Sequence, residues 1–288
     1  MANGAGLRIL SLAVPGFKSQ LSHSLSNGGI MDIDDVMAIA REAGRMMKEA
    51  DRLEVTDKGS KENHVTNMDV AVQEFLRKRL TELLPGSSFV GEEQDYADRS
   101  GEYYWVVDPI DGTTNYIRNL QIAVTSIALV RGNEPVMGVV YNPFTDEMYH
   151  AERGKGAFRN GKPIHVSDRD VSHSIFATSW CAYDKTRSRR SFNISNRMFF
   201  ICEDIRRMGA AAYEMCKLAE GRIDLYFEPI LWPWDHAAAS VIIEEAGGHI
   251  TGERGCARLD DTDRVAAANT KDNLTYLTMV IDDEYSKE

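Results

Sequence analysis

An octapeptide that starts at Asp108, DPIDGTTN, constrains the fold of this chain more than any other stretch. It follows residues 103–107, an aromatic and β-branched run that is typical of a buried strand. Pro109 disfavours helical backbone at the preceding residue, so we expect Asp108 at the end of this strand. Gly112 allows a sharp bend, which would bring Asp111 back towards Asp108. The alternative interpretation of the octapeptide alone is a β-hairpin with an Asp-Gly turn.

The polar groups of this stretch indicate a metal and a phosphate. Two carboxylates and the Ile110 carbonyl between them would face one small volume, and such oxygen ligands suit Mg²⁺. The segment from Gly112 to Asn115 offers backbone N–H groups and hydroxyls at the start of a short helix, which suits a phosphate. The net charge of −11 argues against nucleic acid or an anionic membrane as the main partner. An anionic phosphate would therefore need a local cation, which again indicates a metal.

Length and composition are those of a globular protein that can bury a sizeable core. No apolar run approaches the length of a membrane span. The four cysteines form no Cys-x-x-Cys pair, which favours a reducing cytoplasm over a disulfide or zinc framework. Residues 1–30 contain no acidic residue and many Ser and Gly, so we expect a poorly ordered leader or extension there. Met31 opens the first convincing helix and is favoured as the functional start.

Periodicity divides the remainder into two subdomains. Residues 31–173 are predicted to be an N-terminal metal- and phosphate-binding subdomain, in which helices are followed by an antiparallel meander of strands. The polar segment 55–66 is interpreted as a flexible loop, either solvated or able to close over an anion. Residues 174–288 alternate strands and helices and are predicted to be a C-terminal α/β subdomain.

Three acidic residues are ambiguous when each is taken alone. Asp69 lies in the first turn of a predicted helix, where an acidic side chain favours the helix dipole. Asp235 precedes an apolar helix and is typical of a helix cap. Glu92 follows a short strand and a glycine, shortly before the strand that ends at Asp108. Because of their positions around the octapeptide, we consider all three to be candidate site residues.

Three segments in this order resemble the inositol monophosphatase family: GEE at 91–93, WVVDPIDGTTN at 105–115, and WD at 234–235 leading into EEAGG at 244–248. The family consists of Mg²⁺-dependent, lithium-sensitive sugar phosphatases. The resemblance implies an α+β fold, a layered α-β-α-β-α sandwich with an antiparallel N-terminal sheet and a mixed C-terminal sheet. It also implies a homodimer.

The resemblance implies two to three Mg²⁺ ions, with Mn²⁺ able to substitute, held by Glu92, Asp108, the Ile110 carbonyl, Asp111 and Asp235. Phosphate would bind at Gly112, Thr113 and Thr114. The catalytic residues that orient the attacking water would be Glu92, Thr113 and Asp69. The substrate would contact Glu228 and the position of Ala210, where the family often has a small hydroxyl residue. Asn63 is a second departure, since many members have Asp there.

The implied activity is hydrolysis of inositol monophosphate or a related polyol or sugar phosphate, by direct attack of metal-activated water. The alternatives are a fructose-1,6-bisphosphatase, a 3'(2'),5'-bisphosphate nucleotidase and a non-catalytic paralogue. A basic segment with Lys185, Arg187, Arg189 and Arg190 is either a solvated face or holds a second phosphate. The sequence leaves open the natural substrate, the role of residues 1–30, the oligomer size and lithium sensitivity.

Overall fold

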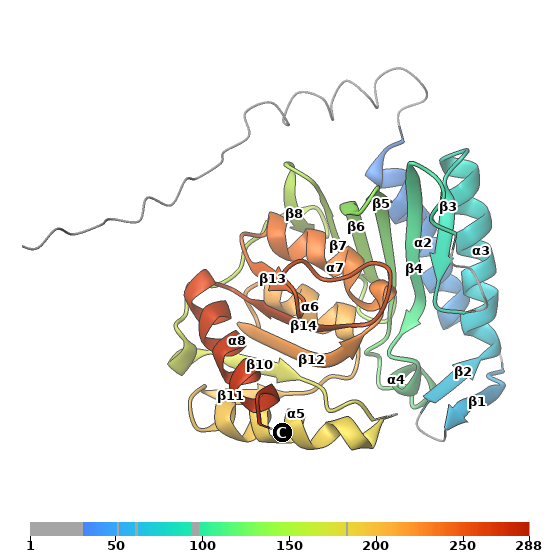
Figure 1. Ribbon diagram of the computed structural model, residues 1–288. Coiled ribbons are helices and arrows are strands. Elements are labelled where there is room, and N and C mark those ends of the chain that lie inside the picture. Colours follow the sequence, from blue (N-terminus) through green and yellow to red (C-terminus); the bar gives the residue numbers. More distant parts are fainter. Residues whose placement is uncertain (1–30, 51, 61–62, 94–97, 183, 288) are drawn as a thin grey trace, which may run out of the picture. The chain divides into compact units, whose positions relative to one another are not determined.

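The computed structural model describes residues 31–50, 52–60, 63–93, 98–182 and 184–287, without the side chains of 58–60 and 63 (Figure 1). All the elements below belong to one compact unit, Ile33–Glu288. The prediction for residues 1–30 lies outside the described residues. So does the prediction that the lysines of segment 55–66 close over an anion.

The larger sheet has seven strands in the order β3-β4-β5-β6-β7-β8-β9. Their bounds are β3 Ser88–Gly91, β4 Tyr103–Asp111, β5 Val124–Arg131, β6 Glu134–Asn142, β7 Glu147–Glu152, β8 Gly156–Arg159 and β9 Lys162–Ile164. The meander from β4 to β9 is antiparallel, as predicted. The edge pair β3–β4 is parallel, with Gly91 opposite Val107. Because parallel strands end at the same edge of a sheet, this pair carries Glu92 to the end of β4.

The smaller sheet has five strands in the order β11-β10-β12-β14-β13. Their bounds are β10 Ile175–Thr178, β11 Asp204–Arg206, β12 Leu225–Leu231, β13 His249–Thr251 and β14 Asp263–Ala268. Strand β10 runs parallel to β11 and β12, whereas β14 runs antiparallel to β12 and β13. The predicted mixed sheet is therefore confirmed.

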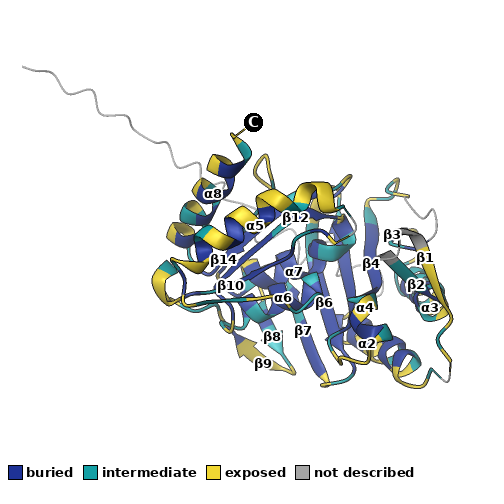
Figure 2. Ribbon diagram, turned by 90° about the horizontal axis from the view of Figure 1, so that it is seen from below, coloured by how far each residue is buried: buried dark blue, intermediate teal, exposed yellow. Residues whose placement is uncertain are grey.

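Helices cover the sheets in three layers (Figure 1). Helices α2 (Ile33–Lys48) and α3 (Asn67–Leu83) pack on one face of the larger sheet. Helices α6 (Ala211–Ala219) and α7 (Pro233–Glu245) lie between the two sheets. Helices α5 (Lys185–Phe199) and α8 (Lys271–Tyr285) cover the outer face of the smaller sheet and expose their other side (Figure 2). The predicted α-β-α-β-α sandwich is thus confirmed. The remaining helices are short: α4 (Thr113–Ile117) and the 3₁₀ turn η3 (Val171–His173).

The central layer is largely apolar, as burial between two sheets requires. Nine of the thirteen residues of α7 are buried. Gly138 of β6 faces this helix so closely that a Cβ there would clash with the Ala238 carbonyl. A glycine in a strand interior thus sets the close packing of α7 on the larger sheet.

The prediction of a flexible loop over 55–66 is wrong. The segment forms an antiparallel hairpin of β1 (Val55–Ser60) and β2 (Asn63–Thr66), with Val55 opposite Thr66. Its residues are mostly polar, so it shows no apolar alternation to indicate strands. Backbone hydrogen bonds form the ladder without that signal. None of the helices among the described residues is long and apolar enough to cross a membrane.

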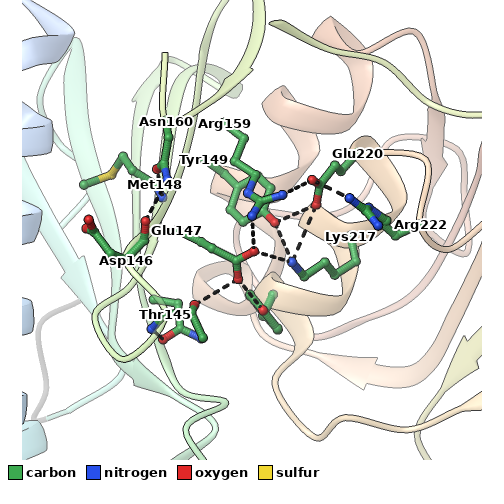
Figure 3. A network of polar contacts seen from close by, with 12 residues as sticks. Thr145, Asp146, Glu147, Met148, Tyr149, Arg159, Asn160, Lys217, Glu220 and Arg222 are labelled. Atoms are coloured by element: carbon green, nitrogen blue, oxygen red, sulfur yellow. Dashed lines mark hydrogen bonds and ion pairs between the residues drawn. The ribbon is translucent and has the colours of Figure 1, made fainter. Parts of the chain in front are cut away.

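A buried charge network joins the larger sheet to α6 (Figure 3). Lys217 of α6 donates to Glu147 Oε1 at 2.8 Å and to the Tyr149 hydroxyl at 2.7 Å. Arg159 lies 2.8 Å from the same Glu147 carboxylate and also pairs with Glu220. The side chains of Glu147 and Glu220 are only 9% exposed, so both carboxylates depend on these cations.

We expect Lys217→Met to lower the free energy of unfolding by about 3–5 kcal/mol, because it leaves buried carboxylates with one cation fewer. Urea denaturation measures this. The control is Lys155→Met, whose lysine is 66% exposed and pairs with Glu152 on the surface. It should cost at most about 1 kcal/mol. Equal losses in the two variants would contradict the importance of the network.

Candidate active site

The site starts where β3 and β4 end side by side. The Glu92 N–H donates to the Val107 carbonyl at 3.2 Å, which extends the pairing of the two strands by one residue. Asp108 is 2% exposed, and its Oδ1 accepts the Ile110 N–H at 2.9 Å. The Glu92 carboxyl group lies near that of Asp108 and raises its pKa. The Asp108 carboxylate therefore stabilises the turn that follows it, through its hydrogen bond with the Ile110 N–H.

Gly112 turns the chain from β4 into α4. Its φ is 88°, in the left-handed region that favours glycine. A Cβ at this position would lie 2.9 Å from the Ile122 carbonyl oxygen and 3.0 Å from Ala210 Cβ, so a side chain is excluded by space as well. Thr113 and Thr114 are the first residues of α4, and their N–H groups lie at its N-terminus.

Asp69 performs two tasks in the structure. Its carboxylate accepts the Thr66 N–H at 2.7 Å and the Thr66 hydroxyl, which completes a capping box at the start of α3. Its other oxygen lies 3.2 Å from Thr113 Oγ1, which is also 3.2 Å from the Ile110 carbonyl. Asp69 is fully buried, so the cap and the contact with Thr113 fix each other.

Asp111 and Asp235 both lie at helix N-termini. Asp111 accepts the N–H groups of Ala211 and Ala212, at 3.0 and 2.8 Å, and so joins β4 to the start of α6. Asp235 accepts the Trp232 N–H at 2.6 Å in the first turn of α7. An ionised carboxylate has about four acceptor positions, so each group retains capacity for a further ligand.

These carboxyl groups form one electrostatic cluster. Burial raises the pKa of Asp108 well above its usual range, and Glu92, Asp111 and Asp235 raise it further. Burial also raises the pKa of Asp111 to about 7, against the hydrogen bonds from α6 that lower it. The pKa of Asp235 is raised by burial first and then by Glu92 and Asp111. Acidic groups that repel one another in a buried volume fit a divalent cation.

The donor set fits Mg²⁺ in its chemistry, since all its members are oxygen atoms. Its present arrangement is not a closed metal cage. Within the described part of the chain, no group of three or more His, Cys, Asp and Glu side chains is arranged to hold an ion. Asp111 and Asp235 instead direct oxygens to helix N–H groups.

Glu228 and Ala210 border this cluster. Glu228 lies on β12 and accepts the Tyr226 hydroxyl at 2.6 Å. Burial raises its pKa, while hydrogen bonds from Tyr226 and Ser179 lower it. Ala210 is buried at the N-cap of α6, directly before the residues that bind Asp111. Because alanine has no hydroxyl, this cap makes no side-chain hydrogen bond.

Comparison with known proteins decides the family. The sequence profile of the inositol monophosphatase family matches residues 32–284. The chain belongs to the inositol monophosphatase family. The resemblance inferred from the three sequence segments is thereby confirmed.

Relatives of this chain carry several names. A protein of Aquifex aeolicus named fructose-1,6-bisphosphatase/inositol-1-monophosphatase is 35% identical over 230 residues, 77% of this chain and 84% of that protein. The Nus factor SuhB of Escherichia coli is 34% identical over 238 residues, 81% of this chain and 89% of that protein. The solved structure of an IMPase from Thermotoga maritima has a TM-score of 0.79 at 27% identity, covering 88% of this chain and 98% of that one.

In this family member, two residues near the site had no assigned role from sequence. The Asn115 amide lies within hydrogen-bond distance of the Ile122, Met208 and Gly209 carbonyls, at 2.9, 2.7 and 3.3 Å. Glu214 accepts the N–H groups of Met208 and Gly209. The two side chains thus hold the segment before α6 from both sides. Asn115 was visible in the octapeptide, whereas Glu214 lies in an alanine-rich helix with no distinguishing signal.

We expect Glu214→Ala to cost about 1–3 kcal/mol of unfolding free energy for each N–H left without its acceptor. Glu214→Gln is the control, because its amide oxygen still accepts both N–H groups.

Burial and Glu228 raise the pKa of Glu214 from 4.5 to about 8. The unfolded chain therefore loses this proton earlier than the folded one, and stability falls as pH rises from 4.5 to 8. The free energy of unfolding, measured by urea titration at several pH values in that window, should fall less steeply with pH in Glu214→Gln than in the wild type. An unchanged pH dependence would contradict the raised pKa.

The basic segment lies elsewhere in the fold. It forms the first turns of α5, on the outer face of the smaller sheet. Glu228 hydrogen-bonds Tyr226, whose side chain belongs to the core on the α6 and α7 side. Arg189 and Arg190 line a cavity on the α5 and α8 side instead. A second phosphate at the mouth of the candidate active site is therefore not the role of these two arginines.

Proposed function

We propose that this chain is a Mg²⁺-dependent phosphomonoesterase that acts on inositol monophosphate or a related polyol or sugar phosphate. The observation that carries the proposal is the carboxylate cluster of Glu92, Asp108, Asp111 and Asp235, of which Asp108 and Asp111 are buried, next to the Thr113–Asp69 contact. Its position at the ends of β3 and β4, beside the N-terminus of α4, suits a phosphate whose charge a cation shares.

The Ile110 carbonyl and the four carboxylates would hold the metal. When bound, Mg²⁺ would neutralise the phosphate, lower the pKa of water and stabilise the leaving oxygen. The N–H groups of Thr113 and Thr114, after Gly112, would bind phosphate oxygens. Asp69 accepts from the Thr113 hydroxyl and so fixes its direction; together with Glu92, this hydroxyl would orient the attacking water.

Glu228 favours a monophosphate substrate. Its carboxyl group would accept a hydrogen bond from a polyol hydroxyl but would repel a second phosphate. Fructose-1,6-bisphosphatase is the second candidate, favoured by the name of the Aquifex aeolicus relative. A non-catalytic binding protein is favoured only by the name Nus factor that some relatives carry. The presence of all predicted ligands argues against that.

A panel of phosphate esters tests the proposal. The purified protein is assayed with Mg²⁺ on inositol 1-phosphate, fructose 1,6-bisphosphate and a 3',5'-bisphosphate nucleotide, beside Asp108→Asn as the matched control. We expect the highest kcat/KM on inositol 1-phosphate. A preference of about tenfold or more for fructose 1,6-bisphosphate, about 1.4 kcal/mol, would reverse the choice of substrate. No hydrolysis of any ester would overturn the proposed function.

The proposal also includes a cytoplasmic location and a homodimer. All four cysteines are free thiols, which supports a reducing cytoplasm. A homodimer is expected from the family, and light scattering of the purified protein measures it.

A further inference from the structure

A cavity of about 500 Å³ opens between α5, the smaller sheet and α8. Among the described residues, four guanidinium groups line it and one carboxylate does, that of Glu253. The arginines are Arg187, Arg189, Arg190 and Arg264. The volume lies in the range of small-molecule sites, about 300–1,000 Å³. In a protein with a net charge of −11, this concentration of positive charge is unusual.

The arginines are held near one another around Tyr285. Arg264 lies over the ring at 3.9 Å and Arg190 at 5.0 Å from its centroid. Arg264, Arg190 and Arg187 all lower the pKa of Tyr285, which burial raises more strongly. The phenol is therefore near three guanidinium groups at once. Two of them come from α5 and one from β14, whereas the ring belongs to α8.

Much of this positive charge is not neutralised by the protein. Arg187 pairs with Asp184 at 3.0 Å, and Arg264 Nη2 pairs with Glu253 at 2.9 Å. Arg189 and Arg190 have no carboxylate partner among the described residues. The Arg264 Nη1 atom is buried and, within the described part of the chain, has no acceptor to which it donates a hydrogen bond. A buried donor without an acceptor costs free energy that a bound anion would recover.

This cavity is separate from the candidate active site. Phe227 of β12 packs into the core formed with α5 and α8, whereas its neighbour Tyr226 packs into the core formed with α6 and α7. Glu228 is bonded to Tyr226 and so faces the candidate active site. Pro229 lines the cavity. The two sites therefore lie on opposite faces of the same strand.

We propose that this cavity binds a small molecule with two or more phosphate groups, through Arg189, Arg190 and Arg264. Guanidinium groups suit phosphate because their planar fork donates two parallel hydrogen bonds. The cavity also lies at the first turns of the 15-residue helix α5, whose N-terminus favours negative charge. The two phosphate groups could be the separate phosphate esters of a sugar bisphosphate or the linked groups of inorganic pyrophosphate, and both carry the chemistry that the arginines recognise.

Isothermal titration calorimetry with the full chain tests the proposal. Inorganic pyrophosphate and fructose 1,6-bisphosphate are titrated separately, with EDTA present to prevent metal-dependent binding or hydrolysis at the candidate active site. The variant Arg189→Ala/Arg190→Ala is compared with Arg77→Ala/Arg131→Ala, which removes the same charge from two surface arginines that are each 38% exposed.

We expect the wild-type protein and the control to bind a probe alike, and the Arg189/Arg190 variant to bind at least about tenfold more weakly. Similar affinity for both probes would mean that the cavity recognises the phosphate groups alone. Tighter binding of fructose 1,6-bisphosphate would mean that it also recognises the sugar or the spacing of its two phosphates. Absence of binding of both probes, or equal weakening in the control, would overturn the proposal.

A second measurement does not depend on any variant. Binding of pyrophosphate to the wild-type protein should weaken as NaCl is raised from low to physiological concentration, because salt screens charges that are partly exposed. An affinity that is independent of salt would exclude recognition by these arginines.

Discussion

Asp108→Asn is expected to lower kcat by at least ~10³-fold, because it removes a charge from the side chain that the family resemblance implies would contact both main metal ions. The fold should persist. Asparagine has the same shape, and its amide oxygen can still accept the Ile110 N–H that the Asp108 carboxylate accepts now. Steady-state kinetics on the best ester of the substrate panel measures the change, and the thermal unfolding midpoint verifies the fold.

The control for this variant is Asp260→Asn. Asp260 is 70% exposed and pairs with Arg258 on the surface, and it belongs neither to the carboxylate cluster nor to the residues expected to bind phosphate. We expect kcat of that control to stay within a factor of about two of wild type, since exposed pairs contribute little. An Asp108→Asn enzyme with near-normal kcat would remove Asp108 from the chemistry.

The octapeptide was predictable because its constraints are local. Proline acts on the residue before it, and glycine supplies a positive φ, so the extended backbone at Asp108 and the turn at Gly112 follow from a few neighbouring residues. The strand was expected to end at Asp108, but β4 continues to Asp111 with a register shift between these two residues. The layered fold was predictable through apolar periodicity in the helices and through the family resemblance. The meander was predictable because alternating strands and turn residues also act at short range.

What the sequence did not reveal depends on long-range contacts. The bonds of Asp111 to Ala211 and Ala212 connect residues about one hundred positions apart, and nothing in the local sequence of β4 or α6 indicates them. The same holds for Asn115 and the carbonyls of Met208 and Gly209. Each contact exists only because α6 packs between the two sheets.

Two further differences have distinct causes. The hairpin β1–β2 was missed because strand pairing uses backbone groups that every residue carries, so a polar segment can form it. The arginines of α5 were recognised as unusual, but only two roles were considered for them: a solvated face, or binding of a second phosphate at the active site. A separate cavity on the other face of the smaller sheet was not considered. Arg264 and Tyr285, which complete the cavity, lie more than seventy residues further along the chain.

Removal of divalent metal is expected to abolish hydrolysis, and added Mg²⁺ to restore it, with Mn²⁺ as a partial substitute. The physical reason is that Asp108 is buried and Asp235 is partly buried, beside further acidic groups that raise the pKa values of both. Ionising all the carboxyl groups of such a cluster is unfavourable unless a cation neutralises them. Activity is measured after dialysis against EDTA and again during titration with MgCl₂. Full activity in the dialysed protein would contradict metal dependence.

A second readout, independent of turnover, separates a metal site from a mere requirement of the substrate for Mg²⁺. A cation that binds only the folded chain stabilises it by RT ln(1 + [Mg²⁺]/Kd), so the unfolding midpoint should rise with MgCl₂ in the absence of any ester. At a hundredfold excess over Kd the gain is about 2.7 kcal/mol. Asp235→Asn should reduce this rise, because it removes one carboxylate of the cluster, whereas Asp260→Asn should preserve it. A midpoint that rises equally in both variants would assign the effect to general salt and not to the carboxylate cluster.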